Sequence, residues 1–210
     1  IVYSYTSINI SIKKNDIVGI IGKTGSGKTT LANILVGILK NQNGKILIDE
    51  RYNINEIFKK NKNLFGFIPQ STFLLDDSIK NNVAFGEENI NFNSELFWKS
   101  LKISKIDEFV KNLPNQENEI VGERGVRISG GQIQRLGIAR ALYRKPEILI
   151  LDEATSSLDI ETEKLFIEAI AQMKNKITMI IITHRLSSLK ICNKVYEIKS
   201  GNLVENNSLI

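Results

Sequence analysis

With 210 residues, of which 42% are apolar and 24% charged, the chain is long enough to bury a core and too apolar for a disordered protein. Its formal net charge of +5 comes from lysines scattered along the sequence, so charge alone does not predict nucleic-acid binding. The single cysteine excludes an internal disulfide, and the longest apolar runs fall far short of the roughly 20 residues that cross a bilayer.

Strand-like and helix-like patterns alternate along the chain. In chain order, hydrophobic periodicity predicts strands at 8–12 and 17–22, a helix at 28–40, strands at 45–48 and 64–68, short helices between about 71 and 145, a strand at 147–151, a helix at 160–173, and strands at 178–182 and 194–198. This order predicts an α/β domain with a mostly parallel core sheet and an inserted helical segment. The chain begins with Ile1 and shows no signal peptide, which is expected of a piece of a longer protein.

A glycine-rich loop follows the continuous apolar strand at 17–22. Residues 22–29, "GKTGSGKT", match the G-x-x-x-x-G-K-[ST] pattern and open the next helix. Glycines let backbone N–H groups surround an anionic phosphate chain, Lys28 would neutralise the β and γ oxygens, and Thr29 would offer its hydroxyl to Mg²⁺. The predicted nucleotide-binding residues here are Gly22, Lys23, Thr24, Gly25, Ser26, Gly27, Lys28, Thr29 and Thr30.

Two carboxylates end the apolar run "ILILDE" at 148–153. In folds with such a phosphate loop, Asp152 lies beside the loop and can hold Mg²⁺ directly or through water. Glu153 can polarise a water for attack on the γ-phosphate. The alternative is that both residues only end the strand and begin the next loop. The phosphate loop in the same chain favours the catalytic interpretation.

With these motifs in place, the sequence resembles the nucleotide-binding domain of ABC transporters over essentially its whole length. Gln70 in "FIPQ" matches the family's Q-loop, and residues 128–132, "ISGGQ", match the signature with Ile for the usual Leu. Asp159 in "SSLD" matches the D-loop, and His184 in "ITHR" matches the switch histidine. Standing alone, Gln70 and Asp159 would be taken as polar loop residues, and His184 as a structural histidine.

This resemblance implies a P-loop NTPase fold with an ABC-type subdomain arrangement. It implies one ABC domain over 1–210, with a RecA-like core and N-terminal antiparallel β elements in 1–70 and 146–210. A helical signature subdomain would occupy 71–145. The implied catalytic residues are Glu153, His184, Lys28 and Gln70, and the implied metal ligands are Thr29, Gln70 and Asp152.

The resemblance also implies a partner for the signature turn. Two copies of such a domain pack head to tail, and each ATP lies between the phosphate loop of one copy and the signature of the other. Ser129, Gly130, Gly131 and Gln132 would then form a second site for the γ-phosphate, since they precede a helix. The alternative is an ordinary helix start capped by a serine, which would explain Ser129. It would not explain the two glycines and Gln132 that follow.

Adenine stacking in the family uses an aromatic residue of an N-terminal strand. Tyr5 is the candidate, with Tyr3 second, although the interval between Tyr5 and Gly22 is shorter than the family pattern. Residues 74–86 and 121–132 resemble the exporter branch, in which "GERG" contributes to cross-talk between sites. Glu123 and Arg124 of that motif could equally form a solvated ion pair. The run 111–125 has a weak likeness to lipid-linked oligosaccharide flippases.

The expected function is that of an ATP-hydrolysing motor domain of an exporter or flippase, with ATP and Mg²⁺. Its expected partners are a second copy of itself and transmembrane domains, expected in the same full-length chain, with no nucleic acid. The domain would then lie at the cytoplasmic face of the inner or plasma membrane. Two alternatives remain open: a chromosome-maintenance ATPase, which needs a long coiled coil between Gln70 and Ser129, and a soluble translation-associated ABC protein with tandem cassettes. No residue predicts the transported substrate.

Overall fold

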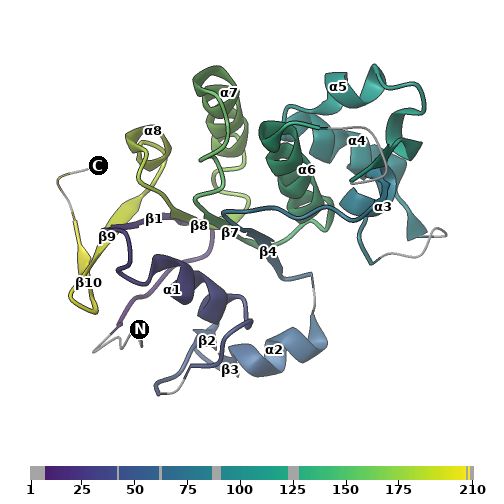
Figure 1. The fold of residues 1–210 in the computed structure, drawn as a ribbon. Helices are drawn as coiled ribbons and strands as arrows, with labels where there is room; N and C mark the ends of the chain where they lie inside the picture. The colour runs from purple at the N-terminus through teal and green to yellow at the C-terminus, as the bar shows by residue number, and fades with distance from the viewer. Residues whose placement is uncertain are drawn as a thin grey trace. The chain divides into compact units, whose positions relative to one another are not determined.

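A computed structural model gives the fold of the chain (Figure 1). The structure describes residues 8–41, 43–61, 63–86, 91–122, 128–206 and 208. The chain divides into two compact units, one made of Ile1–Phe67, Pro146–Glu153 and Lys174–Ile210, the other of Ile68–Lys145 and Ala154–Met173. We call them the sheet unit and the helical unit. The subdomain division expected from the sequence stays a prediction, and it differs in placing 154–173 with the core.

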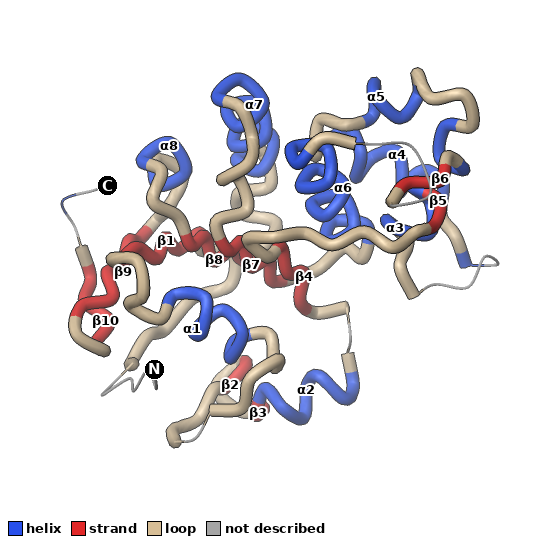
Figure 2. Tube along the Cα trace, viewed as in Figure 1, coloured by secondary structure: helices blue, strands red, loops and turns tan. Residues whose placement is uncertain are grey.

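A six-stranded sheet, in the order β10-β9-β1-β8-β7-β4, forms the centre of the sheet unit (Figure 2). Its strands are β1 (Ile17–Gly22), β4 (Phe65–Ile68), β7 (Ile148–Asp152), β8 (Thr178–Ile182), β9 (Lys194–Lys199) and β10 (Asn202–Glu205). The pairs β1–β8, β1–β9 and β7–β8 are parallel, whereas β10 runs antiparallel to β9. The mixed α/β class with a mostly parallel core sheet, predicted from the sequence, is confirmed.

The central strand β1 has both faces covered, as its unbroken apolar sequence predicts. Val18 and Ile20 pack in a core with Leu31 and Ala32 of helix α1 (Lys28–Leu35). On the other face, a Cβ atom at Gly19 would lie 2.8 Å from the Leu189 side chain of helix α8 (Leu186–Leu189). Figure 1 shows α1 and α8 on opposite faces of the sheet. Alternation along β1 therefore sets which helix covers which face.

A short antiparallel ribbon and one helix complete the sheet unit. The ribbon pairs β2 (Leu47–Ile48) with β3 (Tyr52–Asn53), and helix α2 (Ile54–Lys60) follows it. Asn53 caps this helix, because its side chain accepts a hydrogen bond from the Asn55 amide at 3.0 Å.

The helical unit has its own apolar core. Its elements are β5 (Asp77–Ser78), α3 (Ile79–Val83), α4 (Ser94–Ile103), α5 (Asp107–Lys111), a 3₁₀ turn at Gln116–Asn118, β6 (Ile120–Val121), α6 (Gly130–Tyr143) and α7 (Ile160–Ala171). Phe97, Leu101, Val110 and Leu136 are fully buried in this core. This buried core can stabilise the helical unit without contributions from the sheet.

Two predicted elements differ markedly from the structure, and the strand predicted at 45–48 is shortened to Leu47–Ile48. Residues 8–12, predicted as a strand, carry no strand, although Ile8, Ile10 and Ile12 still pack against the core of the sheet unit. The helix predicted to reach residue 40 ends at Leu35, because Gly37 adopts a positive φ of 76° and a Cβ there would meet the Phe58 ring at 2.5 Å. Ile38 beyond this turn is 63% exposed.

Among the helices of the described residues, none combines the length and the apolar character needed to span a membrane.

Candidate nucleotide site

The loop between β1 and α1 has the conformation that its glycines permit. Gly25 and Gly27 have φ values of 80° and 99°, in the left-handed region that favours glycine. Gly27 is the N-cap of α1, so its reversal starts the helix without a side-chain cap. The first-turn N–H groups of an α-helix have no partner within the helix, so this helix start is suited to binding a phosphate.

Lys28 curls back over this loop. Its Nζ donates to the carbonyl oxygens of Gly22 at 2.9 Å and Lys23 at 3.1 Å, and the residue is 6% exposed. Burial lowers the pKa of the Lys28 ammonium, and the nearby carboxylates of Glu153 and Asp152 partly offset that shift. A buried ammonium held at the mouth of the loop can contact phosphate oxygens without a large rearrangement.

Asp152 is a buried carboxylate whose partners are incomplete. It ends β7, is 1% exposed, and neither of its oxygens accepts a hydrogen bond of normal geometry from the described residues. Burial raises the pKa of the Asp152 carboxyl, while the nearby Thr29 hydroxyl and Lys28 ammonium lower it and Glu153 raises it. An orphaned buried carboxylate near a hydroxyl fits a Mg²⁺ site, because both are hard oxygen ligands.

Glu153 and His184 contact each other directly. The His184 Nε2 lies 2.9 Å from the Glu153 Oε1, and the two side chains are 46% and 22% exposed. Glu153 has a positive φ of 48°, and its amide donates to the Ile182 carbonyl of β8 at 2.8 Å. This backbone conformation turns the carboxylate out of the β7 strand, and His184 follows the next strand, β8. The contact can orient the carboxylate for work as a base.

The signature turn forms a capping box at the start of α6. The Ser129 Oγ accepts from the Gln132 amide at 3.2 Å, and the Gln132 Oε1 accepts from the Ser129 amide at 2.7 Å. The capping box thus explains the presence of Gln132 by a local hydrogen bond, which the sequence interpretation had missed. A Cβ at Gly130 would meet nothing within 4 Å, so packing inside the described chain does not require glycine there.

Gln70 and Asp159 lie in the helical unit, together with the signature. Gln70 is exposed after β4, and Asp159 is the N-cap of α7, where its Oδ1 accepts from the Thr162 amide at 2.9 Å. Hydrogen bonds from Thr162 lower the pKa of the Asp159 carboxyl. Tyr3, Tyr5, Glu123 and Arg124 lie outside the described residues.

The predicted site residues thus fall into two groups. The loop 22–30, Asp152, Glu153 and His184 belong to the sheet unit, whereas Gln70, the signature residues 129–132 and Asp159 belong to the helical unit. Within the first group, the charges of Lys28, Asp152 and Glu153 interact, and Glu153 contacts His184. The expectation that Gln70 reaches the metal, and that a second copy supplies the signature, stays a prediction.

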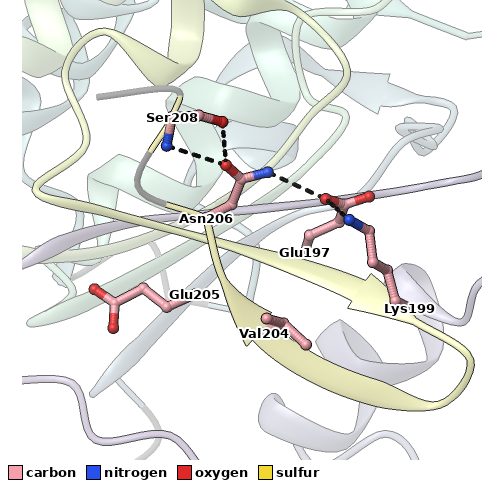
Figure 3. Close-up of a pocket in the computed structure, with 6 residues that line it drawn as sticks. All are labelled: Glu197, Lys199, Val204, Glu205, Asn206 and Ser208. Carbon is pink, nitrogen blue, oxygen red and sulfur yellow. Dashed lines mark hydrogen bonds and ion pairs between the residues drawn. The ribbon is translucent and has the colours of Figure 1, made fainter.

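A polar depression at the β9–β10 edge is separate from these residues (Figure 3). It has a volume of about 360 Å³ and is lined by Glu197, Lys199, Val204, Glu205, Asn206 and Ser208. The Glu197 carboxylate already accepts from Lys199 at 2.9 Å and from Asn206 at 3.1 Å. These bonds lower the pKa of Glu197 and satisfy its charge locally, so we assign no ligand to the depression.

Sequence reasoning missed Gln134, which is buried in α6 at 2% exposure. Its amide contacts the segment that carries Gln70. The available signal was a polar residue among the apolar positions of an amphipathic helix, but that pattern does not name a partner.

Together, the phosphate loop, the buried lysine and the strand-end carboxylates on a mostly parallel sheet define a P-loop nucleotide-binding domain. The family model described as ABC transporter matches residues 5–156. The chain therefore belongs to the ABC transporter family, whose exporters are ATPases.

Two relatives and one solved structure carry the names of exporters. Multidrug export ATP-binding/permease proteins from Staphylococcus aureus strains NCTC 8325 and COL are each 39% identical over 199 residues, which is 94% of this chain and 34% of theirs. A solved bacterial Atm1-family ABC exporter with ATP bound matches with a TM-score of 0.82 and 33% identity, over 91% of this chain and 33% of that one. The chain thus spans about a third of the length of these relatives.

Proposed function

We propose that the chain is the motor domain of an exporter, which binds and hydrolyses ATP to drive transport through a membrane-spanning part of the same protein. The observation that carries the proposal is the buried Lys28 curled over the phosphate loop near the unpaired carboxylate of Asp152. The relatives are named as ATP-binding/permease fusions, which supports a permease partner in the same chain. The nucleotide-binding domain would then work at the cytoplasmic face of the membrane.

In the proposed site, backbone N–H groups of residues 22–27 and the Lys28 ammonium hold the phosphates, aided by Thr30. Thr29 and Asp152, joined by Gln70, would hold Mg²⁺, which would offset the negative charge of the phosphates. Adenine would stack on Tyr5.

Hydrolysis needs a base and a group that stabilises the moving charge. Glu153 takes the proton of the attacking water, and His184 holds the Glu153 carboxylate through the 2.9 Å contact until the γ-phosphate arrives. His184 then donates to a γ-phosphate oxygen as negative charge moves in the transition state. Both residues follow neighbouring parallel strands, which fixes their spacing.

A second copy would close each site. The N–H groups of Gly130 and Gly131 and the Ser129 hydroxyl would meet the γ-phosphate bound by the partner copy, with Asp159 at the same interface. The open space at Gly130 supports this arrangement, because none of the described residues requires a glycine there and a glycine allows close approach by an outside group.

The test uses Glu153→Gln, which keeps the shape of the side chain and removes its basicity. We expect the purified variant to bind ATP, to lose hydrolysis by about 10²-fold or more, and to dimerise with MgATP but not with ADP. Light scattering after size exclusion measures the dimer, and adding Ser129→Arg should return it to monomer. Hydrolysis at the wild-type rate in Glu153→Gln would remove Glu153 from the role of base.

The alternatives have less support. A chromosome-maintenance ATPase needs a sustained heptad pattern between Gln70 and Ser129. In the described part of that interval, the longest helix, α4, has 10 residues. The two relatives and the solved structure described above carry exporter names, which favours an exporter over a translation-associated protein.

A further inference from the structure

One stripe of helix α6 holds the chain segment that carries Gln70. Gln134, Gly137 and Arg140 are spaced by three residues, so they lie along one face of the helix. All three contact residues 69–82. The same helix begins at the signature, with Ser129 as its N-cap.

Both polar atoms of the Gln134 side-chain amide form hydrogen bonds. Its Nε2 donates to the Pro69 carbonyl at 3.1 Å, and its Oε1 accepts from the Thr72 hydroxyl at 3.2 Å. These partners bracket Gln70, one before it and one two residues after it. Because Gln134 is buried, breaking either bond would leave polar groups without water to replace the lost partner.

Gly137 provides a seat for Thr72. A Cβ at position 137 would lie 2.4 Å from the Thr72 Oγ1 and 2.5 Å from its Cγ2, closer than side chains can approach. Thr72 therefore fits against the helix backbone itself, where it also reaches Gln134. Thr72 is therefore held both by its hydrogen bond to Gln134 and by its packing against Gly137.

Arg140 continues the attachment. Its Nη1 donates to the Phe73 carbonyl at 2.9 Å, and its Nε donates to the Asn82 carbonyl at 2.7 Å. The Asn82 Oδ1 in turn accepts from the Leu75 amide at 2.8 Å. Bonds that span more than 60 residues of sequence thus hold the segment to α6 from Pro69 to Phe73, and Leu75 is attached indirectly through Asn82.

We propose that Gln134 is a positioning residue that locks the Gln70 segment to the signature helix, so that Gln70 and Ser129 move as one body. The inference rests on the proposed function, in which Gln70 acts at the metal and Ser129 at the γ-phosphate of the partner copy. A displacement of Gln70 on nucleotide binding is then passed along α6 to its N-terminus rather than absorbed by the loop. Gln134 itself touches neither nucleotide nor metal.

The first test measures how firmly the Gln70 segment is attached to α6, without relying on catalysis. In the complete protein, Gln134→Met keeps the length of the side chain and removes both hydrogen bonds. Amide hydrogen exchange in the peptide 69–76 should become about 5- to 30-fold faster, while exchange in β7 and β8 stays unchanged. Thr72→Val, which retains shape and loses the hydroxyl, should give a smaller increase and serves if Gln134→Met does not fold.

The matched control is Ile138→Val on the same helix, a buried side chain outside the core cluster against which Leu74 packs. It should leave exchange in 69–76 at the wild-type rate. Wild-type exchange there in both Gln134→Met and Thr72→Val would overturn the proposed attachment, and so would equal acceleration by Ile138→Val.

The second test asks whether Gln134 acts through Gln70. We expect Gln134→Met to lower kcat for ATP about tenfold with KM changed less than about twofold, because a misplaced group costs the transition state most. In a Gln70→Ala background the same change should lower kcat less than about twofold. A tenfold loss in both backgrounds would show independent effects and overturn the coupling.

Failure of the proposed function looks different. If Gln70→Ala hydrolyses ATP at the wild-type rate, the assigned role of Gln70 is wrong and the catalytic part of the inference falls with it. The exchange comparison still decides whether the lock exists.

Discussion

Asp152→Asn should make the protein more stable without metal and less responsive to MgATP. The carboxylate is 1% exposed and both oxygens lack normal hydrogen-bond partners. Burial is the largest influence on its pKa and outweighs the attraction of Lys28, so the charge itself destabilises the fold. Asparagine removes that charge at nearly constant shape.

The change in unfolding free energy for Asp152→Asn is limited because the asparagine amide is also buried without partners. An unsatisfied buried polar group costs about 1–3 kcal/mol, more when charged, but the new amide also lacks partners. The net gain in unfolding free energy is therefore about 1 kcal/mol, or a melting temperature ~2–4 °C higher for a chain of this size. With MgATP at about 100 times its Kd, the wild type should gain about 2.7 kcal/mol, and the variant should lose the Mg²⁺-dependent part.

Thermal unfolding in chelator and in excess MgATP measures both effects. The pH dependence supplies a check on sign: a carboxyl whose folded pKa is raised contributes stability below its unfolded pKa of about 3.9 and loses it as pH rises through the folded pKa. The advantage of the variant should thus vanish as pH falls toward 4. A variant at least 1 kcal/mol less stable in chelator, or one with the full MgATP shift, would refute this reasoning.

Three further predictions concern single side chains. Lys28→Ala should weaken ATP binding about 10²-fold by calorimetry, because the loop loses its buried ammonium, and wild-type affinity would exclude Lys28 from the site. His184→Ala should keep nucleotide affinity and lower kcat by about 10²-fold, whereas an equal loss of ADP binding would indicate a structural histidine. Burial raises the pKa of the Cys192 thiol to about 12, so the folded protein should resist alkylation at pH 8 and react once unfolded; rapid labelling of the native chain would contradict this.

The fold was predictable where one local pattern decided the outcome. The strand 17–22 matches β1 because an apolar run of that length, between polar residues, needs burial on both faces. The helix end at Leu35 was not predictable, since apolar residues continue to Leu39 and only the close approach of Phe58 explains Gly37. Residues 8–12 show that apolar alternation can secure packing without a strand ladder.

The candidate site shows the same limit. Spacing after the apolar strands predicted Lys28, Asp152 and Glu153 as candidates, because parallel strands end at a common edge. The contact between Glu153 and His184 depends on strands β7 and β8 being neighbours, which the sequence order does not state. Gln134 was missed for a related reason: its partners lie more than 60 residues away.

The reversed strand β10 has a consequence for how the protein avoids self-association. A parallel sheet that ended at β9 would offer an open row of backbone donors and acceptors to any other extended chain. The hairpin at Ser200 and Gly201 folds four residues back over that row, and Asn202, Val204 and Glu205 are exposed along it. Because β10 has only four residues and exposes Asn202 and Glu205, it offers a further strand a shorter and more polar edge than β9 would.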